Sequence, residues 1–212
     1  MKKSDFSEKE FEILCCSEMF SRYNCDFYFP TQRKEVNKGY DARFKHKKFR
    51  ALFFQFKVPR EYSKSFFNNS CQMFGFPTHK TKKGNQKQHN LLVKLNNNFT
   101  NSACYLVPLF IDRKDLITNF RSQQLLNYCV GLLPKYSLSN GNHTIYYDKN
   151  NAVQKCDSEE ELRIANIEEV DLRKSEELEY KDFVDYLNVQ DDGLFQFLGK
   201  HNIFMLYKII DD

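Results

Sequence analysis

Apolar residues recur at the spacing of one helical face directly after the polar N-terminus. Ser7 and Glu10 have the spacing of a capping box, in which each side chain bonds the backbone N–H of the other residue and so starts a helix. The apolar residues that follow predict a helix over 8–23; they are Phe11, Leu14, Cys15 and Met19.

Two apolar-rich segments, 40–44 and 49–58, flank a basic tip and predict a β-hairpin. On a strand, alternate residues share a face, so Gln55 and Lys57 lie on the face opposite the apolar one. The residues of the apolar face are Leu52, Phe54, Phe56 and Val58.

Further along, the pattern predicts alternating helices and strands without internal repeats. The expected elements are a helix over 86–97, a strand over 103–111, a helix from Asp115 or Thr118 to about 130, a hairpin of 143–147 with 152–156, a helix near 176–187 and a strand over 202–209.

The order helix, strand, strand, helix, strand defines a core over 1–118. The remaining residues, 119–212, are expected to be an elaboration packed on that core, with a hairpin, an acidic helix and a final strand.

Composition excludes several classes of protein. The 212 residues are 41% hydrophobic and 16% aromatic, with 7 Gly and 5 Pro, which is typical of a folded domain and not of a disordered chain. The longest apolar run, 104–111, is far shorter than the roughly 20 residues that cross a bilayer. The 7 cysteines lack CxxC spacing, which favours reduced thiols over disulfides or zinc. We therefore expect a cytoplasmic protein that does not enter a membrane.

The net charge of +4 conceals a strong asymmetry. Residues 1–156 carry +14 and residues 157–192 carry −10. A positive front of this size suits a polyanion such as nucleic acid, although lysine-rich surfaces are also common. The acidic stretch is either a solvated helical surface or a region that binds a protein partner.

Three side chains are candidates for a catalytic site: the carboxylate of Asp41, the amide of Gln55 and the ammonium of Lys57. An amide and an ammonium beside large apolar residues need partners, and Asp41 on the neighbouring strand of the hairpin is the obvious one. An odd-residue turn or a bulge would pair Asp41 near Phe53, on the face of Gln55 and Lys57, whereas an even-residue turn would put it on the opposite face.

Together these groups would suit phosphodiester hydrolysis. Asp41, the Gln55 amide oxygen and the Phe56 carbonyl could hold a hard divalent cation, with Lys57 orienting the attacking water. A second carboxylate should come from elsewhere, and the candidates are Glu35, Glu12 and Glu18.

The segments GYDA at 39–42 and QFK at 55–57, in this order of elements, resemble the PD-(D/E)XK, or restriction-endonuclease-like, nuclease superfamily in its QxK variant with Mrr-like spacing. The resemblance implies an α/β fold with a central mixed β-sheet flanked by helices, here with a C-terminal α+β extension. It also implies Mg²⁺ or Mn²⁺ as cofactor, held by Asp41 and Gln55. The "FE" at 11–12 makes Glu12 the matching glutamate. Tyr40 replaces the usual proline and Gln55 the usual acid.

On this resemblance the expected function is a divalent-metal-dependent endonuclease, with a role in restriction or phage defence as one option. DNA is favoured as the substrate, and RNA remains the alternative. The competing hypothesis is a catalytically lapsed module of the same fold that binds nucleic acid or a protein partner. A purely structural role is a separate alternative, in which Asp41, Gln55 and Lys57 form a polar sheet face with a salt bridge at its edge and Glu35 is a solvated loop carboxylate. A homodimer is an open alternative, because cutting both strands of a duplex usually needs two sites.

Basic and polar residues near the expected metal site would contact the phosphates of a bound nucleic acid. Gln88 and His89 lie at the start of the helix expected over 86–97, where they could approach a phosphate. The alternative for His89 is a capping histidine on a surface helix. The cations that would grip the backbone are Arg43, Lys45, Lys47, Lys48, Lys80, Lys82 and Lys83. Phosphate contacts carry no sequence information, so no target sequence is indicated.

Overall fold

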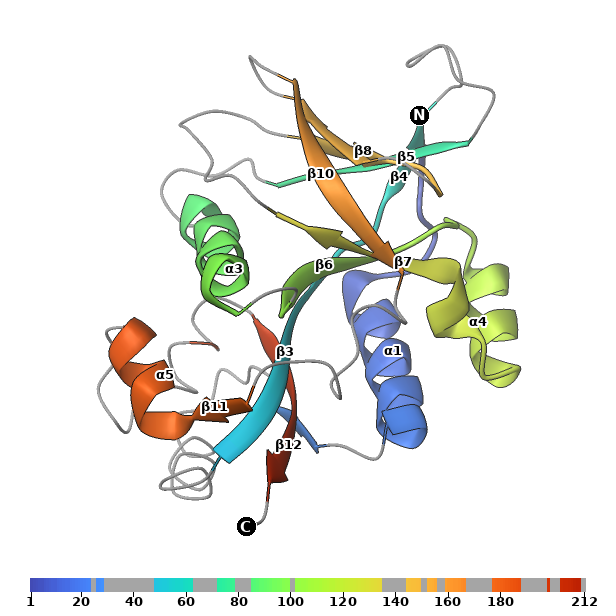
Figure 1. Ribbon diagram of the computed structural model, residues 1–212. Helices are drawn as coiled ribbons and strands as arrows, with labels where there is room; N and C mark the ends of the chain where they lie inside the picture. The colour runs from blue at the N-terminus through green and yellow to red at the C-terminus, as the bar shows by residue number, and fades with distance from the viewer. Residues whose placement is uncertain are drawn as a thin grey trace.

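The computed structural model has a mixed α/β fold (Figure 1). It describes residues 1–23, 26–28, 48–62, 72–78, 85–99, 102–134, 144–149, 152–155, 159–166, 177–187, 198 and 203–210. The helices are α1 (Glu8–Tyr23), α3 (Asn85–Asn98), α4 (Arg113–Arg121), the short 3-10 helix η2 (Leu125–Tyr128) and α5 (Tyr180–Leu187). The strands are β1 (Lys2–Lys3), β2 (Asp26–Tyr28), β3 (Lys48–Phe56), β4 (Arg60–Tyr62), β5 (Met73–Pro77), β6 (Ala103–Pro108), β7 (Cys129–Leu133), β8 (Thr144–Tyr147), β9 (Ala152–Lys155), β10 (Glu159–Asn166), β11 (Glu177–Glu179) and β12 (Phe204–Ile210).

The strands form two sheets that share β10. One sheet has the order β1-β4-β5-β8-β9 and ends on the first half of β10. The second half of β10 opens the other sheet, whose order continues β7-β6-β3-β12-β2, with β11 beside the start of β3. All of these pairs are antiparallel except β3 with β6, which run parallel and are linked through α3.

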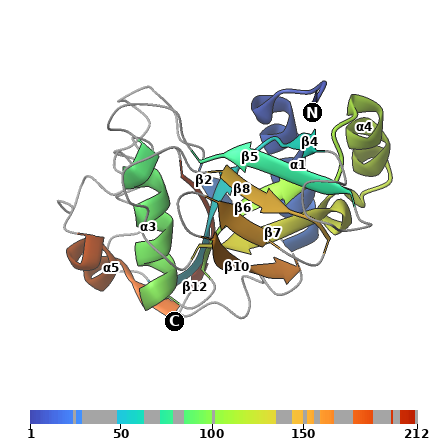
Figure 2. The same ribbon diagram turned by 90° about the horizontal axis from the view of Figure 1, so that it is seen from above.

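Helices cover both faces of the sheet that contains β3 (Figure 2). On one face, the side chains of Leu52, Phe54 and Phe56 form a core cluster with α1, α4 and η2. On the other face, Phe49 and Phe53 belong to a cluster with α3 and α5. The alternation expected for this strand is therefore confirmed, and β3 is buried on both sides.

Helix α1 begins and ends where the sequence predicts. The Ser7 N–H donates to Glu10 Oε2 at 2.9 Å and the Glu10 N–H donates to Ser7 Oγ at 3.1 Å, which is the expected capping box. Phe11 is fully buried and meets Phe56 edge-on, with ring centroids 5.9 Å apart. The predictions for α3, the β8–β9 hairpin and β12 are likewise confirmed to within a few residues.

The strand beside β3 is not the one that the sequence suggested. Phe53 pairs with Met205 of β12 on one edge and with Ala103 of β6 on the other. Both edges of the strand are occupied there, so the pairing of Asp41 near Phe53, which an odd-residue turn or a bulge would give, is wrong. The segment 40–44 itself lies outside the described residues.

The helix expected to run to about residue 130 is shorter in the structure. Helix α4 ends at Arg121, and Gln123 adopts a positive φ of 56° that no α-helix accommodates. The chain then forms η2 and enters β7, which pairs with β6. Strand pairing within the buried sheet here prevails over the local helical pattern.

Candidate functional site

Gln55 is a deeply buried polar residue of the sheet that contains β3. It lies near the end of β3 on the α3 side and is 1% exposed. Its Oε1 has no hydrogen-bond partner within the part of the chain that the structure describes. A buried amide oxygen without a hydrogen-bond donor lowers the free energy of unfolding by about 1–3 kcal/mol. We therefore expect a donor or a cation from outside the described residues to bind this atom.

Tyr105 and His89 are polar neighbours of Gln55 on the same face. Gln55 pairs with Tyr105 in the parallel ladder, and the Tyr105 hydroxyl lies 2.8 Å from His89 Nδ1. Both side chains are buried, and burial raises the pKa of Tyr105 far above its usual range, so the phenol keeps its proton. With 1% exposure, His89 is neither a surface cap nor placed to meet a phosphate; that expectation is corrected.

Lys57 extends beyond the end of β3 toward the start of α1. Its N–H donates to the Leu106 carbonyl at 3.1 Å, which continues the link to β6. Its ammonium lies 3.3 Å from both carboxylate oxygens of Glu8, and the lysine side chain is 17% exposed. The sequence pattern indicated Lys57 but missed Glu8, whose only local signal is its place in the first turn of α1.

Glu12, the expected second carboxylate, lies on the opposite side of the sheet from Gln55. Its helix packs on the face of Phe54 and Phe56, whereas Gln55 points toward the α3 side. Glu12 is 5% exposed and its carboxylate pairs with Lys9. Burial raises the pKa of Glu12, although the Lys9 ammonium partly offsets this. The structure therefore does not bring Glu12 to Gln55.

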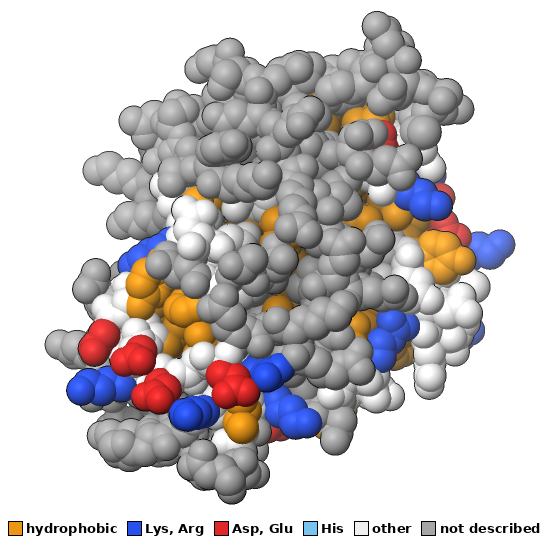
Figure 3. All heavy atoms as spheres, viewed as in Figure 1, with side chains coloured by type: hydrophobic (Ala, Val, Ile, Leu, Met, Phe, Trp, Pro, Cys, Tyr) orange, Lys and Arg blue, Asp and Glu red, His pale blue; other side chains and the backbone are white. Residues whose placement is uncertain are grey.

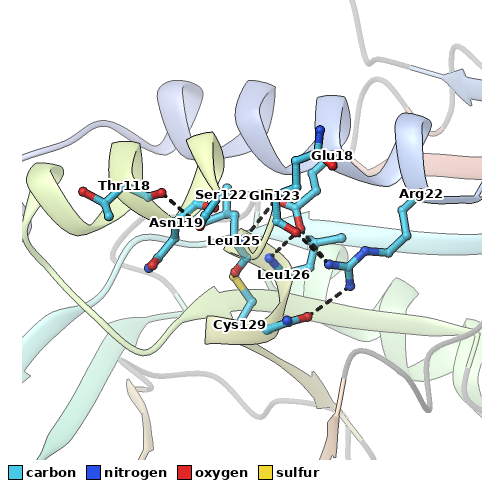
Figure 4. A network of polar contacts seen from close by, with 10 residues as sticks. Glu18, Arg22, Thr118, Asn119, Ser122, Gln123, Leu125, Leu126 and Cys129 are labelled. Carbon is cyan, nitrogen blue, oxygen red and sulfur yellow. Dashed lines mark hydrogen bonds and ion pairs between the residues drawn. The ribbon is translucent and has the colours of Figure 1, made fainter.

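Glu18, the third candidate, supports η2. Its carboxylate accepts from the N–H groups of Leu125 and Leu126 at 2.9 and 3.2 Å and pairs with Arg22 at 2.9 Å (Figure 4). Arg22 also donates to Asn127 Oδ1. The two N–H groups are those that open η2, so Glu18 acts as its cap, and its oxygens are occupied by protein donors.

Most of the other expected site residues are not described. Phe56 ends β3, where it pairs with Leu106. Lys48 is exposed at the start of β3. Gln88 lies in the first half of α3, with its side chain outside the described set. The residues that lie wholly outside the described ranges are Glu35, Asp41, Arg43, Lys45, Lys47, Lys80, Lys82 and Lys83.

Among the described residues, no group of three or more His, Cys, Asp or Glu side chains could hold a metal ion. The helices within the same ranges are all too short or too polar to cross a membrane. Comparison of the chain with protein-family models, curated proteins and solved structures gave no match.

Proposed function

We propose that this protein is a divalent-metal-dependent nuclease whose site lies at the carboxyl end of β3. The observation that carries the proposal is the buried Gln55 Oε1, which has no donor among the described residues. It lies one residue before the end of a strand that runs parallel to β6. Ligand sites of α/β sheets form outside the carboxyl ends of such strands.

The proposed fold is a variant of the restriction-endonuclease-like core. In its support, α1 precedes every strand of the sheet that contains β3, and β3, α3 and β6 form a parallel crossover unit. Two features depart from the expected core. Strands β4 and β5 intervene between β3 and α3, and β12 takes the antiparallel place beside β3.

A hard cation such as Mg²⁺ or Mn²⁺ prefers oxygen ligands, and the unpartnered amide oxygen of Gln55 fits that preference. Gln55 would hold the ion together with Asp41 and, as a second carboxylate, Glu35. When bound, the ion supplies charge that polarises a phosphate and acidifies water. Lys57 would place its ammonium where negative charge develops on the phosphate. In this structure the ammonium pairs with Glu8 of α1, the helix on the face of the sheet opposite Gln55, so it would have to leave Glu8 to reach the ion.

The direct test of the nuclease is cleavage of supercoiled plasmid DNA and of labelled single-stranded RNA, each with Mg²⁺, Mn²⁺ or EDTA. We expect metal-dependent cutting of DNA that falls on the order of 10²-fold in Lys57→Ala, because a positioned charge at the reacting group is removed. Lys114→Ala, at an exposed position of α4, is the control and should cut normally. Equal cleavage by the Lys57 and Lys114 variants would refute the role of Lys57.

A matched pair at Gln55 tests the metal site without relying on catalysis. In Gln55→Leu the orphaned oxygen is removed, so the metal-free protein should gain about 1–2 kcal/mol of unfolding free energy. The same variant should lose the stabilisation by metal, which in the wild type would reach about 2.7 kcal/mol at a metal concentration 100 times the Kd. Gln55→Glu should bind metal more tightly and be less stable without it. Thermal melts across a Mn²⁺ titration measure both quantities; undiminished stabilisation of Gln55→Leu would exclude Gln55 as a ligand.

A second candidate, a lapsed nuclease module that binds nucleic acid, is favoured by one pair of contacts. Lys57 is neutralised by Glu8, and Glu12 by Lys9, on α1. Residues 1–156 nevertheless carry +14, enough for phosphate binding. This candidate predicts a gel shift that weakens steeply with salt, no cleavage, and melting temperatures that Mg²⁺ and Mn²⁺ leave unchanged.

The acidic stretch, residues 157–192, is described only in part. Over β11 and α5, Figure 3 shows acidic and basic side chains side by side, as on a solvated surface.

A further inference from the structure

The sheet of β1, β4, β5 and β8 has one buried face and one partly exposed face. These strands lie side by side near the N-terminus (Figure 1). Directly opposed residues of paired strands share a face, and Phe74 and Tyr147, which are opposed, belong to the core cluster with α3 and α5. Gly75 and Tyr146 are opposed at the neighbouring position, so they lie on the other face. Tyr146 is accordingly only partly buried.

Two tyrosine rings meet over a glycine on this second face. Tyr62 of β4 and Tyr146 of β8 pack edge to face with ring centroids 5.0 Å apart, although β5 lies between their strands. Gly75 of β5 allows this contact, because a Cβ there would lie 2.9 Å from Tyr146 Cδ1 and 3.0 Å from Tyr62 Cε2. Both tyrosines are partly exposed. They form an aromatic surface on which a flat ring can stack.

Two cations lie beside the tyrosine pair on the same face. Lys3 of β1 is directly opposed to Arg60 of β4, and Arg60 is in turn opposed to Gly75. Burial raises the pKa of the Tyr62 phenol, and the positive charge of Arg60 acts against this rise, as expected for neighbours. Among the residues that the structure describes, neither Lys3 nor Arg60 pairs with a carboxylate. Like charges that are directly opposed repel each other, so an anion between them would be stabilising.

We propose that this surface, defined as Lys3, Arg60, Tyr62, Gly75 and Tyr146 and called the tyrosine face, binds single-stranded nucleic acid. Bases stack on the two tyrosines, and phosphates of the same strand contact Lys3 and Arg60. A single strand is selected over a duplex because the faces of its bases are free to stack. The inference rests on the proposed function only for nucleic acid as the class of partner, since none of the five residues belongs to the Gln55 site.

The arrangement of charge favours a strand that carries both phosphates and flat rings. Across the sheet, the row Lys3, Arg60, Gly75 and Tyr146 continues through β9 and reaches an acidic position only at Glu161 of β10. Four strand spacings separate β4 from β10, or about 19 Å. At physiological salt this is more than twice the distance over which exposed charges interact strongly. An acidic peptide would be attracted by the same cations, but it offers the tyrosines no bases to stack on.

The test is fluorescence anisotropy of a labelled oligodeoxythymidine of about 12 nucleotides, titrated with the full chain in EDTA so that nothing is cut. Labelled oligouridine of the same length tests RNA, and the duplex with oligodeoxyadenosine tests double strands. We expect the single strands to bind at least about 10-fold more tightly than the duplex. Tyr146→Leu should weaken their binding about 10-fold, whereas Tyr146→Phe, which keeps the ring, should bind as wild type does. Tyr128→Leu is the matched control, because Tyr128 is 46% exposed and lies in η2, outside the tyrosine face.

The salt dependence tests the two cations separately. For single strands, each phosphate contact contributes about −0.7 to the slope of log K against log salt concentration. Lys3→Ala and Arg60→Ala should therefore each make the slope shallower by about 0.7. Lys114→Ala, at an exposed position of α4, should leave the slope unchanged.

The outcomes separate this inference from the proposed nuclease. Binding that Tyr146→Leu, Lys3→Ala and Arg60→Ala all leave unchanged, in variants whose thermal melts show them folded, overturns the inference even if the protein cuts DNA. Equal affinity for duplex and single strand overturns it too, as does displacement of the strand by a polyglutamate peptide of the same charge. If the strand binds through the tyrosine face and no metal supports cleavage, the nuclease proposal fails and this inference stands.

Discussion

Replacing Glu18 by alanine is expected to lower the free energy of unfolding by about 3–5 kcal/mol. The Glu18 carboxylate is 4% exposed and accepts from the N–H groups of Leu125 and Leu126 and from Arg22. Its removal leaves the two buried N–H donors without their acceptor, while the Arg22 guanidinium keeps only Asn127 Oδ1 and the Gln123 carbonyl. Because η2 leads directly into β7, the loss reaches the sheet.

Urea denaturation of wild type, Glu18→Ala and Glu18→Gln would measure this effect. Glu18→Gln keeps one oxygen acceptor but no charge, so an intermediate loss is expected. Lys114→Ala should stay within about 0.5 kcal/mol of wild type, as exposed positions usually do. A loss below about 1 kcal/mol in Glu18→Ala would show that water replaces the carboxylate and that η2 needs no cap.

Phe183→Ala is expected to cost about 3–5 kcal/mol, the range for deleting a buried aromatic ring. Phe183 of α5 is 1% exposed and stacks on Phe53 with ring centroids 5.4 Å apart. The same ring meets Phe49 edge-on at 5.9 Å and lies 5.5 Å from Phe99. The substitution would open a cavity between α5 and the central strand β3.

Two controls isolate the ring. Lys181→Ala, at an exposed position of the same helix, should be nearly neutral. Phe183→Leu should cost about 1–1.5 kcal/mol because most of the volume remains. Hydrogen exchange followed by mass spectrometry should show faster exchange in β3 as well as in α5. If only α5 responds, the helix is a loosely attached appendage and not part of the core around β3.

The pattern of apolar and polar residues predicted individual helices and strands better than it predicted which strands pair with one another. The bounds of α1 follow from the capping box and the apolar spacing, and the two faces of β3 follow from simple alternation. The pairing of β3 with β12 could not be predicted in this way, because strand pairing depends on tertiary packing between residues far apart in the chain. The same limit explains the helix that was expected to reach residue 130 and instead gives way to β7.

The candidate site was predictable only in part. Gln55 and Lys57 attract notice because an amide and an ammonium alternate with phenylalanines, and the structure buries the first and pairs the second. Glu8 and Tyr105 gave no such signal, since a glutamate in a first helical turn and a tyrosine in an apolar strand are ordinary. Glu12 has the right residue type, but its helix packs on the face of the sheet opposite Gln55.

The place of β12 has a consequence for how the chain is made. On one side β12 bonds Asp26–Tyr28, and on the other it bonds the strand that begins at Lys48, so two early segments are joined by one that is synthesised about 150 residues later. Until then β3 has an open edge rich in phenylalanine, the kind of edge that invites pairing between chains. Folding of this sheet is therefore expected to be slow, since its closing contacts join residues far apart in the sequence.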